Sequence, residues 1–319
     1  MLTIRKIHDI KTPSLKVLAV ALSQDCALCA AGDRDGVTHI IDMASGEIVR
    51  HLKQHVEFVY AMTVEPKTGH LLTTGKDKSI REWNMETGAF IRDYAGIFTS
   101  ASARTLNAQS FKPSTKSHTK TVLCIECADN DLMATGGQDC NVKYWSKGEP
   151  YRSFSWHDGP VVCVRFQPET LTLFSGSKDK TIRSWNVENG AMIHKYSGHR
   201  DEVVSFFFRK KDEFLSVDNA GTVLVWNVEK EQSLGELFFA PDQARCMVYD
   251  KDNDLVIIGL NDGRIVGVTA SHDDKIEVKK PEFMISDHKF AVRSLAVSNG
   301  KLVSCDEEGK VKIWNIESC

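Results

Sequence analysis

Three stretches of the sequence each carry a histidine, then a serine or threonine, then an aspartate and a tryptophan. The aspartate precedes the tryptophan by six residues in all three stretches. A hydroxyl, an imidazole and a carboxylate are the groups that hydrolases use for nucleophilic catalysis. A catalytic site is needed only once, so the recurrence favours a structural role. The residues are His55, Thr73, Asp77 and Trp83; His118, Thr135, Asp139 and Trp145; and His157, Ser175, Asp179 and Trp185.

Two Cys-x-x-Cys pairs, Cys26/Cys29 and Cys124/Cys127, have the spacing of zinc ligands. Both pairs fall in or beside strand-like segments, where residues three apart face opposite sides of a sheet. We therefore expect packed thiols rather than a metal site. The sequence also shows no P-loop, dinucleotide fingerprint, zinc-protease helix or nucleophile elbow. An enzyme is not expected, and no cofactor is predicted.

The segments that carry these residues recur with a period of about forty residues. Five segments align without gaps and share a tryptophan. The tryptophans are Trp83, Trp145, Trp185, Trp226 and Trp314. Two further segments, 31–42 and 258–269, fit the same pattern with Ile41 and Val268 in place of the tryptophan. The pattern therefore indicates seven repeats.

Each repeat contains short strand-like runs separated by turn residues. In the fourth repeat these runs are VVCVRF, LTLFSGS, TIRSWNV and AMIHKYS. Four antiparallel strands per repeat, stacked radially, form a β-propeller blade. One blade cannot bury both of its faces, so successive blades must pack on each other. We predict an all-β, seven-bladed propeller that forms a single domain over residues 1–319.

The two ends of the chain complement each other. The last repeat stops after its third strand, VKIWNIE, and the chain begins with an unassigned strand, LTIRKIHDI. Pairing these two segments would complete the seventh blade and leave no open edge in the ring. We predict that the N-terminal strand closes the propeller in this way.

The repeats resemble those of the WD-repeat family of β-propellers, and the resemblance covers essentially the whole chain. In that family the histidine, the serine or threonine, the aspartate and the tryptophan of a repeat form a hydrogen-bonded set, called the tetrad below. The resemblance implies that the three sets above pin their blades internally. Such a set is chemically reasonable, because a buried carboxylate needs donors and a buried indole N–H needs an acceptor.

Four repeats depart from the family pattern. The fifth and seventh repeats have Ala220 and Glu308 where the aspartate is expected. The first and sixth repeats lack both the tryptophan and the preceding histidine. We expect incomplete tetrads in repeats five and seven, and plain apolar packing in repeats one and six.

In WD-repeat proteins, the face that carries the loops between blades commonly binds partners. The resemblance assigns three positions of each repeat to this face, and acidic residues there are few, chiefly Glu202 and Glu307. Arginine and aromatic residues are enriched in binding hot spots. We expect a basic crescent that binds an extended acidic or phosphorylated peptide; the alternative is an unselected mixture of surface charges. The predicted face residues are Lys16, Arg34, Phe58, Tyr60, Lys76, Trp156, Lys178, Arg245 and Arg293.

An insertion, residues 97–117, separates the second and third repeats on the same face. It is rich in serine and threonine and carries Arg104, Lys112 and Lys116. We expect a surface excursion. The alternative is a regulatory segment, because phosphorylation would reverse its local charge.

Composition limits the function classes. The net charge is −3, which does not favour a surface that coats nucleic acid. The N-terminus lacks a secretory signal, no apolar run reaches the length of a membrane span, and nine cysteines are scattered without framework spacing. We expect reduced thiols in an intracellular, cytoplasmic setting, with the nucleus not separated from the cytosol.

The leading functional prediction is a scaffold or adaptor subunit that binds other proteins and belongs to a multiprotein complex. RNA or phosphorylated ligands on a basic face are the alternative, and a propeller enzyme is the less favoured one. An enzyme that used the central channel would need carboxylates, histidines or metal ligands at the channel mouth, where the predicted lining is mainly lysine and arginine. Because seven-bladed rings serve many activities, the scaffold prediction rests partly on the family resemblance.

Overall fold

The computed structural model describes residues 2–95, 117–128, 132–146, 149–170, 172–272 and 276–318. The predicted insertion, residues 97–117, lies outside the described residues apart from Ser117. The described residues form 28 β-strands in seven four-stranded sheets. None of them belongs to a helix long and apolar enough to cross a membrane.

The first three sheets follow each other along the chain. The strands of blade one are β2 (Val17–Leu22), β3 (Leu28–Asp33), β4 (Val37–Asp42) and β5 (Ile48–Lys53). Those of blade two are β6 (Val59–Val64), β7 (Leu71–Gly75), β8 (Ile80–Trp83) and β9 (Phe90–Ala95). Those of blade three are β10 (Val122–Ala128), β11 (Leu132–Gly137), β12 (Val142–Ser146) and β13 (Glu149–Phe154).

The remaining four sheets continue in the same order. The strands of blade four are β14 (Val161–Phe166), β15 (Thr172–Ser177), β16 (Thr181–Asn186) and β17 (Met192–Ser197). Those of blade five are β18 (Val203–Lys210), β19 (Glu213–Asp218), β20 (Thr222–Asn227) and β21 (Ser233–Phe239). Those of blade six are β22 (Ala244–Asp250), β23 (Leu255–Leu260), β24 (Arg264–Thr269) and β25 (Phe283–Ser286). Those of blade seven are β26 (Val292–Ser298), β27 (Lys301–Asp306), β28 (Lys310–Ser318) and, from the start of the chain, β1 (Leu2–Lys11).

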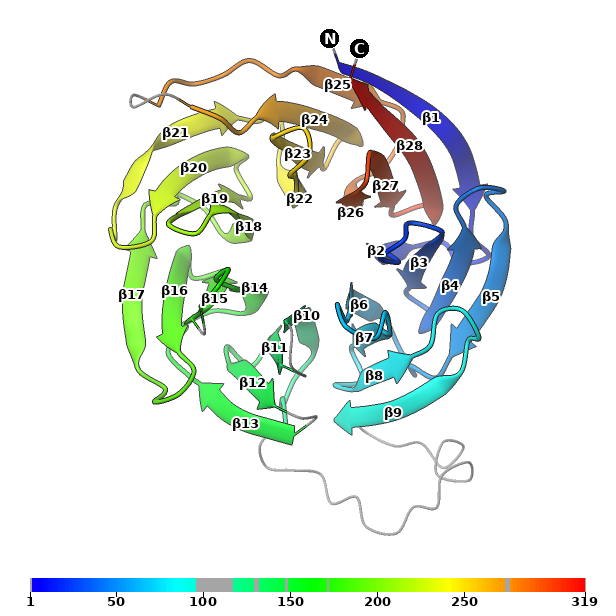
Figure 1. Cartoon of the computed structure of the whole chain (residues 1–319), viewed down its shortest axis with the longest axis horizontal. Helices are drawn as coiled ribbons and strands as arrows, with labels where there is room; N and C mark the ends of the chain where they lie inside the picture. The colour runs from blue at the N-terminus through cyan, green and yellow to red at the C-terminus, as the bar shows by residue number, and fades with distance from the viewer. Residues whose placement is uncertain are drawn as a thin grey trace.

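The seven sheets stand radially around a central opening (Figure 1). In blades one to six the strands run outward in chain order, with the first strand at the channel and the fourth at the rim. Both faces of the middle strands are buried, as in β15 and β16, because neighbouring blades cover them. The predicted all-β, seven-bladed propeller is confirmed.

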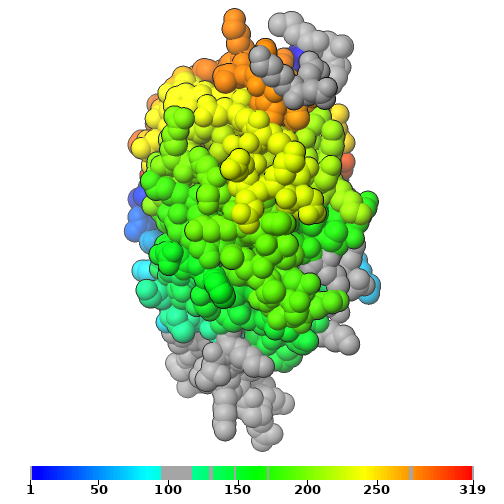
Figure 2. All heavy atoms as spheres, turned by 90° about the vertical axis from the view of Figure 1, so that its left-hand side faces the viewer, coloured from blue at the N-terminus to red at the C-terminus, as the bar shows by residue number. Residues whose placement is uncertain are grey.

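The outer strands form the rim of the ring, which Figure 2 shows at blades four and five. These strands alternate between partly buried and exposed residues, because only one face packs on the blade. Ile193 in β17 and Leu234 in β21 are single exposed apolar residues of this kind. Isolated apolar residues of this sort are ordinary on a protein surface.

The predicted closure of the ring is confirmed. Strand β1 pairs with β28 in antiparallel fashion over nine residue pairs, from Leu2–Ser318 to Lys11–Lys310. Side-chain ion pairs reinforce this β1–β28 seam: the buried Lys312 lies 2.5 Å from Asp287 and 3.4 Å from Asp9. The first strand of the chain therefore supplies the outer strand of the last blade.

The hydrophobic core of the described residues is divided into seven clusters, one between each pair of neighbouring blades. Blades seven and one share a cluster that contains Val303 and Ile313 on one side and Val17 and Ile41 on the other. Apolar burial is the main favourable term in folding. Since every cluster needs two blades, the ring is stable only when all seven are in place.

Each of the five repeat tryptophans packs in the cluster that its blade shares with the preceding blade. Trp185 lies against blade three and Trp226 against blade four. Ile41 and Val268 occupy the corresponding clusters of blades one and six. The repeat alignment therefore placed these two substitutes correctly.

One connection was not anticipated from the sequence. Between β24 and β25 the chain crosses to blade five, where the backbone N–H of Lys279 donates to the carbonyl of Leu237 at 2.8 Å. Ile276 packs beside Gly235 of β21, and a Cβ at Gly235 would lie 3.0 Å from the Cβ of Ile276. Figure 1 shows this segment outside β21 and β24. It covers part of the outer edge of blade five.

Deleting residues 1–10 should lower the melting temperature by roughly 10 °C or more, because the deletion removes the paired strand and exposes two core clusters. Ile4 packs against the cluster of blades six and seven, and Ile10 packs against the cluster of blades seven and one. Thermal unfolding followed by circular dichroism measures the change.

Point variants in the same strand separate a packing effect from a length effect. Ile4→Asp should reproduce much of the loss, whereas Ile7→Asp, at a position 37% exposed, should leave the melting temperature close to that of the wild type. A truncated chain that melts with the wild type would contradict the contribution of the seam to stability.

Candidate functional site

A chain of side-chain hydrogen bonds runs through blade two, from the third strand to the loops at one end of the ring. Trp83 Nε1 donates to Thr73 Oγ1 at 3.0 Å, Thr73 Oγ1 lies 2.8 Å from His55 Nε2, and His55 Nδ1 lies 3.0 Å from Asp77 Oδ1. An indole N–H can only donate, so the Thr73 hydroxyl accepts from Trp83. The Asp77 carboxylate can only accept, so the proton of the neutral His55 ring is on Nδ1, and Nε2 accepts from the Thr73 hydroxyl. His55 Nδ1 therefore donates to Asp77.

The same chain occurs in four other blades. The indole-to-hydroxyl distances lie between 2.7 and 3.0 Å. The hydroxyl-to-histidine distances lie between 2.5 and 2.9 Å. The histidine-to-aspartate distances lie between 2.7 and 3.1 Å. The members are His118, Thr135, Asp139 and Trp145; His157, Ser175, Asp179 and Trp185; His199, Ser216, Asp218 and Trp226; and His288, Ser304, Asp306 and Trp314.

The hydrogen bonds in these sets run in the same direction as those of an Asp-His-Ser catalytic triad, from hydroxyl to histidine to aspartate. A catalytic hydroxyl must be reached by its substrate. The five hydroxyl-bearing residues of the tetrads are fully buried, and each oxygen already accepts a hydrogen bond from an indole. This geometry supports a structural role for the tetrads.

The prediction that blades five and seven lack the tetrad aspartate is wrong. Asp218 and Asp306 supply the carboxylate, at 3.1 Å from His199 Nδ1 and 2.7 Å from His288 Nδ1. They stand two residues before Ala220 and Glu308, the positions at which the alignment placed the aspartate.

The same tight turn thus delivers a carboxylate from two different positions. In blades two to four the aspartate is followed directly by a residue at positive φ, such as Lys78 (64°) or Lys180 (69°). In blades five and seven the aspartate comes two residues earlier, and glycine occupies the positive-φ position, as at Gly221 (88°). An aspartate three residues before a glycine is the sequence signal that would have identified the second form.

The prediction of plain apolar packing in blade one is also wrong. Asp33 Oδ2 lies 3.0 Å from His39 Nε2, and His39 Nδ1 lies 2.8 Å from His51 Nδ1 on the outer strand. This relay connects the turn to the rim without a tryptophan. In blade six, Ile258 and Leu260 do lie in an apolar cluster, as predicted.

A buried cation accompanies several tetrads and was missed by the sequence analysis. Arg81, two residues before Trp83, places Nη1 3.0 Å from Asp77 and Nε 2.9 Å from Asp93, and it is 2% exposed. Arg183 lies 3.7 Å from Asp179 in the same way. The signal is a basic residue at the second position before the tryptophan.

The protonation states of Asp77 and His55 in blade two agree with the directions of these hydrogen bonds. Burial disfavours the ionised carboxylate, but hydrogen bonds from His55 and Ser79 and the charge of Arg81 outweigh it and hold the pKa of Asp77 well below its usual range. Burial lowers the pKa of His55. The pair therefore consists of a carboxylate and a neutral imidazole at neutral pH.

In blades two, four and seven the tetrad joins the two loops that border predicted face residues. The loop before the first strand of a blade contains the histidine, and the turn after the second strand contains the aspartate. Backbone bonds join the same two loops: the N–H of Arg34 donates to Lys16, that of Lys76 to Phe58, and that of Lys178 to Pro160, at 2.9 to 3.1 Å. Face positions that are distant in sequence are thereby fixed side by side.

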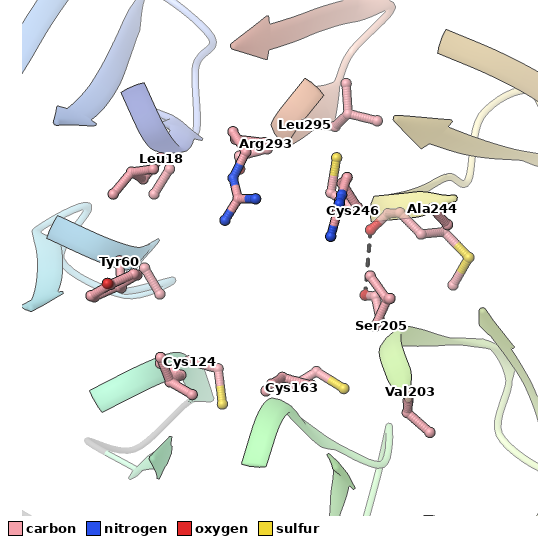
Figure 3. Close-up of a pocket in the computed structure, with 18 of the residues that line it drawn as sticks. Leu18, Tyr60, Cys124, Cys163, Val203, Ser205, Ala244, Cys246, Arg293 and Leu295 are labelled. Carbon is pink, nitrogen blue, oxygen red and sulfur yellow. Dashed lines mark hydrogen bonds between the residues drawn. The ribbon is translucent and has the colours of Figure 1, made fainter. Parts of the chain in front are cut away.

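The central channel contains a cavity of about 440 Å³, of which Figure 3 shows the lining. Four predicted face residues line it, namely Tyr60, Lys178, Arg245 and Arg293. The other five, Lys16, Arg34, Phe58, Lys76 and Trp156, lie outside the lining. The structure therefore divides the predicted face into a channel part and a peripheral part.

The second residue of each innermost strand lines this cavity, and these seven residues are called the channel mouth below. Five of them are apolar or aromatic and come from consecutive blades, one to five. The other two are arginines, from blades six and seven. Figure 3 shows Arg293 extending into the opening, with Leu18 and Tyr60 on another side. The seven are Leu18, Tyr60, Leu123, Val162, Val204, Arg245 and Arg293.

The peripheral part is concentrated at blades one and two. Two cations lie near the ring of Phe58, with Arg34 Cζ 5.9 Å and Lys76 Nζ 5.2 Å from its centroid. The ring of Phe58 also makes an edge contact with Tyr60 at 5.7 Å. This aromatic pair connects the peripheral part to the channel mouth. Trp156, in blade four, is 62% exposed.

Acidic residues pair with more of the basic residues of the predicted crescent than the sequence suggested. Glu307 lies 3.6 Å from Lys16 and 3.5 Å from Arg293, and Glu202 lies 2.6 Å from Lys178. Glu57, which the sequence analysis did not consider, lies 2.6 Å from Lys76. The face is therefore patterned in charge and not uniformly basic.

The cysteines of the pair Cys124/Cys127 are packed apart. Cys124 lies in the cluster of blades three and four, whereas Cys127 packs against the cluster of blades two and three. Cys26 and Cys29 are both buried. Within the described residues, no group of three or more His, Cys, Asp and Glu side chains is arranged to hold a metal ion.

Comparison with known proteins assigns the chain to a family. The sequence profile described as "WD domain, G-beta repeat" matches residues 46–84, 110–146 and 148–186. The profile described as "IP5P C-F beta-propeller" matches residues 239–319. Together with seven four-stranded blades and five tetrads, these matches are decisive. The chain contains WD repeats and folds as a seven-bladed β-propeller.

Curated relatives of this WD-repeat propeller are distant in sequence. A U3 snoRNP-associated protein-like protein of Arabidopsis thaliana is 25% identical over 89% of this chain and 62% of its own length. A guanine nucleotide-binding protein subunit beta of the same plant is 24% identical over 87% of this chain and 72% of its own length. A transcriptional corepressor, LEUNIG homolog, is 21% identical over 97% of this chain and 36% of its own length. The chain thus spans less than two thirds of the first and third of these relatives.

Asp218→Asn should lower the free energy of unfolding by about 1–3 kcal/mol at pH 7, because it leaves a buried histidine N–H with a weaker acceptor. Burial raises the pKa of Asp218, but bonds from His199 and the Thr222 amide outweigh it, so the pKa lies below its usual value. The stabilising contribution is complete above the unfolded pKa of about 4 and is lost as the pH falls toward the folded value. The deficit of the variant, measured by urea unfolding, should therefore shrink below pH 4.

Asp262→Asn is the matched control. Asp262 occupies in blade six the position where the alignment expects the tetrad aspartate, but it is exposed and bonds Arg264. Its loss should change stability little. Equal effects of the two substitutions would refute the assignment of Asp218 to the tetrad.

Proposed function

We propose that this WD-repeat propeller is a non-catalytic scaffold or adaptor subunit, and that it acts as a single domain. Its partner is another protein, which presents an extended acidic or phosphorylated segment to the face around the central channel. The observation that carries the proposal is the joint placement of Tyr60, Arg245 and Arg293 at one open cavity, continuous with the cation-flanked Phe58.

The chemistry of this face suits protein recognition. Tyrosine and arginine are enriched in interface hot spots, since each combines a large contact area with directional donors. The face residues also stand in or beside loops that are joined by backbone hydrogen bonds and, in blade two, by the tetrad. A preorganised surface loses little entropy when a partner binds.

Paired charges favour selectivity over general attraction of anions. Lys16, Lys76 and Lys178 each have a carboxylate within 4 Å. A bound segment must either supply new partners for these carboxylates or leave them paired with the lysines. A purely anionic ligand therefore gains less binding energy than the number of lysines suggests. Complementary patterning of this kind contributes to partner choice.

The relatives are compatible with a role as a subunit. Their names include a subunit of a guanine nucleotide-binding protein and a probable subunit of coatomer. The name of the snoRNP-associated relative raises RNA as an alternative ligand. Offset lysines on the face and a net charge of −3 give RNA less support.

The thiols support an intracellular setting. The eight cysteines among the described residues are free, and burial raises the pKa of Cys29, Cys163 and Cys246 to about 12. Thiols of this kind are unreactive at neutral pH. A reducing compartment is the usual location of a chain with unpaired cysteines.

Charge reversal at the channel mouth, Arg245→Glu with Arg293→Glu, should abolish capture of partner proteins from cell extract. Both side chains are partly exposed at the cavity, so the fold should remain intact. Affinity purification followed by mass spectrometry compares the variant with the wild type, and a melting curve checks folding.

Lys211→Glu provides the control. Lys211 lies in the turn between β18 and β19, between the first and second strands of blade five, whereas the face loops precede the first strand or follow the second. It is 60% exposed and pairs only with Glu169 among the described residues. A face variant that captures the same proteins as this control and the wild type would overturn the proposed function.

A further inference from the structure

The channel mouth is divided into an apolar side and a cationic side. Blades one to five contribute Leu18, Tyr60, Leu123, Val162 and Val204, and blades six and seven contribute the two arginines. The cavity is also lined by Arg165, Lys178 and Glu202. Arg165 pairs with Glu126 at 3.0 Å, and Lys178 pairs with Glu202 at 2.6 Å. The charge available to a ligand is therefore that of Arg245 and Arg293.

Arg245 is held in place by neutral groups. Its Nε donates to Asn261 Oδ1 at 3.0 Å, and its Nη2 donates to Asn261 Oδ1 at 2.6 Å and to Gln243 Oε1 at 3.2 Å. No carboxylate of the described residues lies within ion-pair distance of it. These amides orient the guanidinium without neutralising it.

Arg293 is only weakly satisfied. Its Nη1 lies 3.5 Å from Glu307 Oε1, and its buried Nε has no hydrogen-bond partner within the described part of the chain. Glu307 also has Lys16 at 3.6 Å, so it would keep a counter-ion if Arg293 turned to a ligand. A buried donor without a partner is costly, and an incoming acceptor would remove that cost.

The cationic and apolar sides of the channel mouth suit the alternating side-chain directions of an extended peptide. Adjacent side chains of an extended segment point in opposite directions. A segment that crosses the mouth can therefore direct one side chain to the arginines and its neighbour to the apolar wall. Several arginine donors are already engaged with Asn261, Gln243 and Glu307, so a carboxylate with two oxygens fits better than a phosphate with three.

We propose that the channel mouth binds an acidic side chain and an adjacent large apolar side chain of a partner's extended segment. The carboxylate bonds Arg245 and Arg293, and the apolar side chain packs against Leu123, Val162 and Val204. This proposal rests on the proposed function and narrows the partner segment to an acidic–apolar pair in which phosphorylation is not required.

A peptide array tests the pair directly with the full chain. The peptides have a Gly/Ser frame in which two adjacent positions carry every combination of residues, including phosphoserine, and each is made with a free and an amidated C-terminus. Peptides that place Asp or Glu beside Leu, Ile, Phe or Tyr should be retained about tenfold more strongly than those with either residue alone, a difference of about 1.4 kcal/mol.

Substitutions on the cationic side and on the apolar side of the channel mouth should change peptide binding in different ways. Arg293→Met keeps the aliphatic stem and should reduce retention of the acidic–apolar peptides about tenfold. Leu123→Ser should remove the preference for an apolar neighbour while the preference for an acid persists. Lys211→Met should bind as the wild type does, and melting curves establish that each variant is folded.

The outcomes that overturn the proposal are distinct from those that test the proposed function. Retention of acidic peptides without regard to the neighbour, preference for phosphoserine, dependence on a free C-terminus, or no retention of any peptide would each refute the acidic–apolar pair. If extract proteins are still captured in an arginine-dependent manner, the proposed function stands and only this inference fails.

Discussion

The hydrogen bond between the tetrad histidine and aspartate is the interaction on which the binding face depends. In blade two it joins the loop that leads into β6 to the turn that follows β7. Phe58 and Tyr60 follow the histidine, and Lys76 precedes the aspartate, so the same bond fixes the spacing of three face residues. At its other end the chain of bonds reaches Trp83, which packs against blade one. Packing between blades and the positions of the face loops are therefore coupled.

Ring closure imposes a second constraint on this coupling. Each core cluster requires two blades, so the loops of one blade are held in place only if the neighbouring blades are present. The mouth takes Arg245 and Arg293 from blades six and seven, while Leu18 and Tyr60 come from blades one and two. The β1–β28 seam thus keeps the cationic and apolar sides at a fixed separation, although no residue of β1 lines the cavity.

Much of the fold could be predicted from the sequence because the repeat is periodic and the tryptophan marks one position in each blade. Ile41 and Val268 were placed correctly since their neighbours kept the pattern. The aspartates of blades five and seven were missed because an alignment fixed on the tryptophan compares single positions, whereas a tight turn can present a carboxylate from either of two. Asp218 reaches His199 because glycine at position 221 takes the positive φ that a lysine takes in blade four. Glu57 and Glu307 were underestimated because pairing across loops depends on three-dimensional proximity.

The balance of charges determines what the face can recognise. With Lys16, Lys76 and Lys178 offset by carboxylates, long-range attraction of an anionic partner is limited and is screened further at physiological salt. Binding strength must then come largely from apolar contact, from Arg245, which the protein orients with neutral amides, and from Arg293, whose ion pair with Glu307 is long at 3.5 Å. The apolar side of the mouth is formed by five consecutive blades, so it offers area that the paired lysines do not. Recognition at this propeller is therefore expected to depend on the shape and the apolar neighbour of an acidic residue more than on the total charge of the partner.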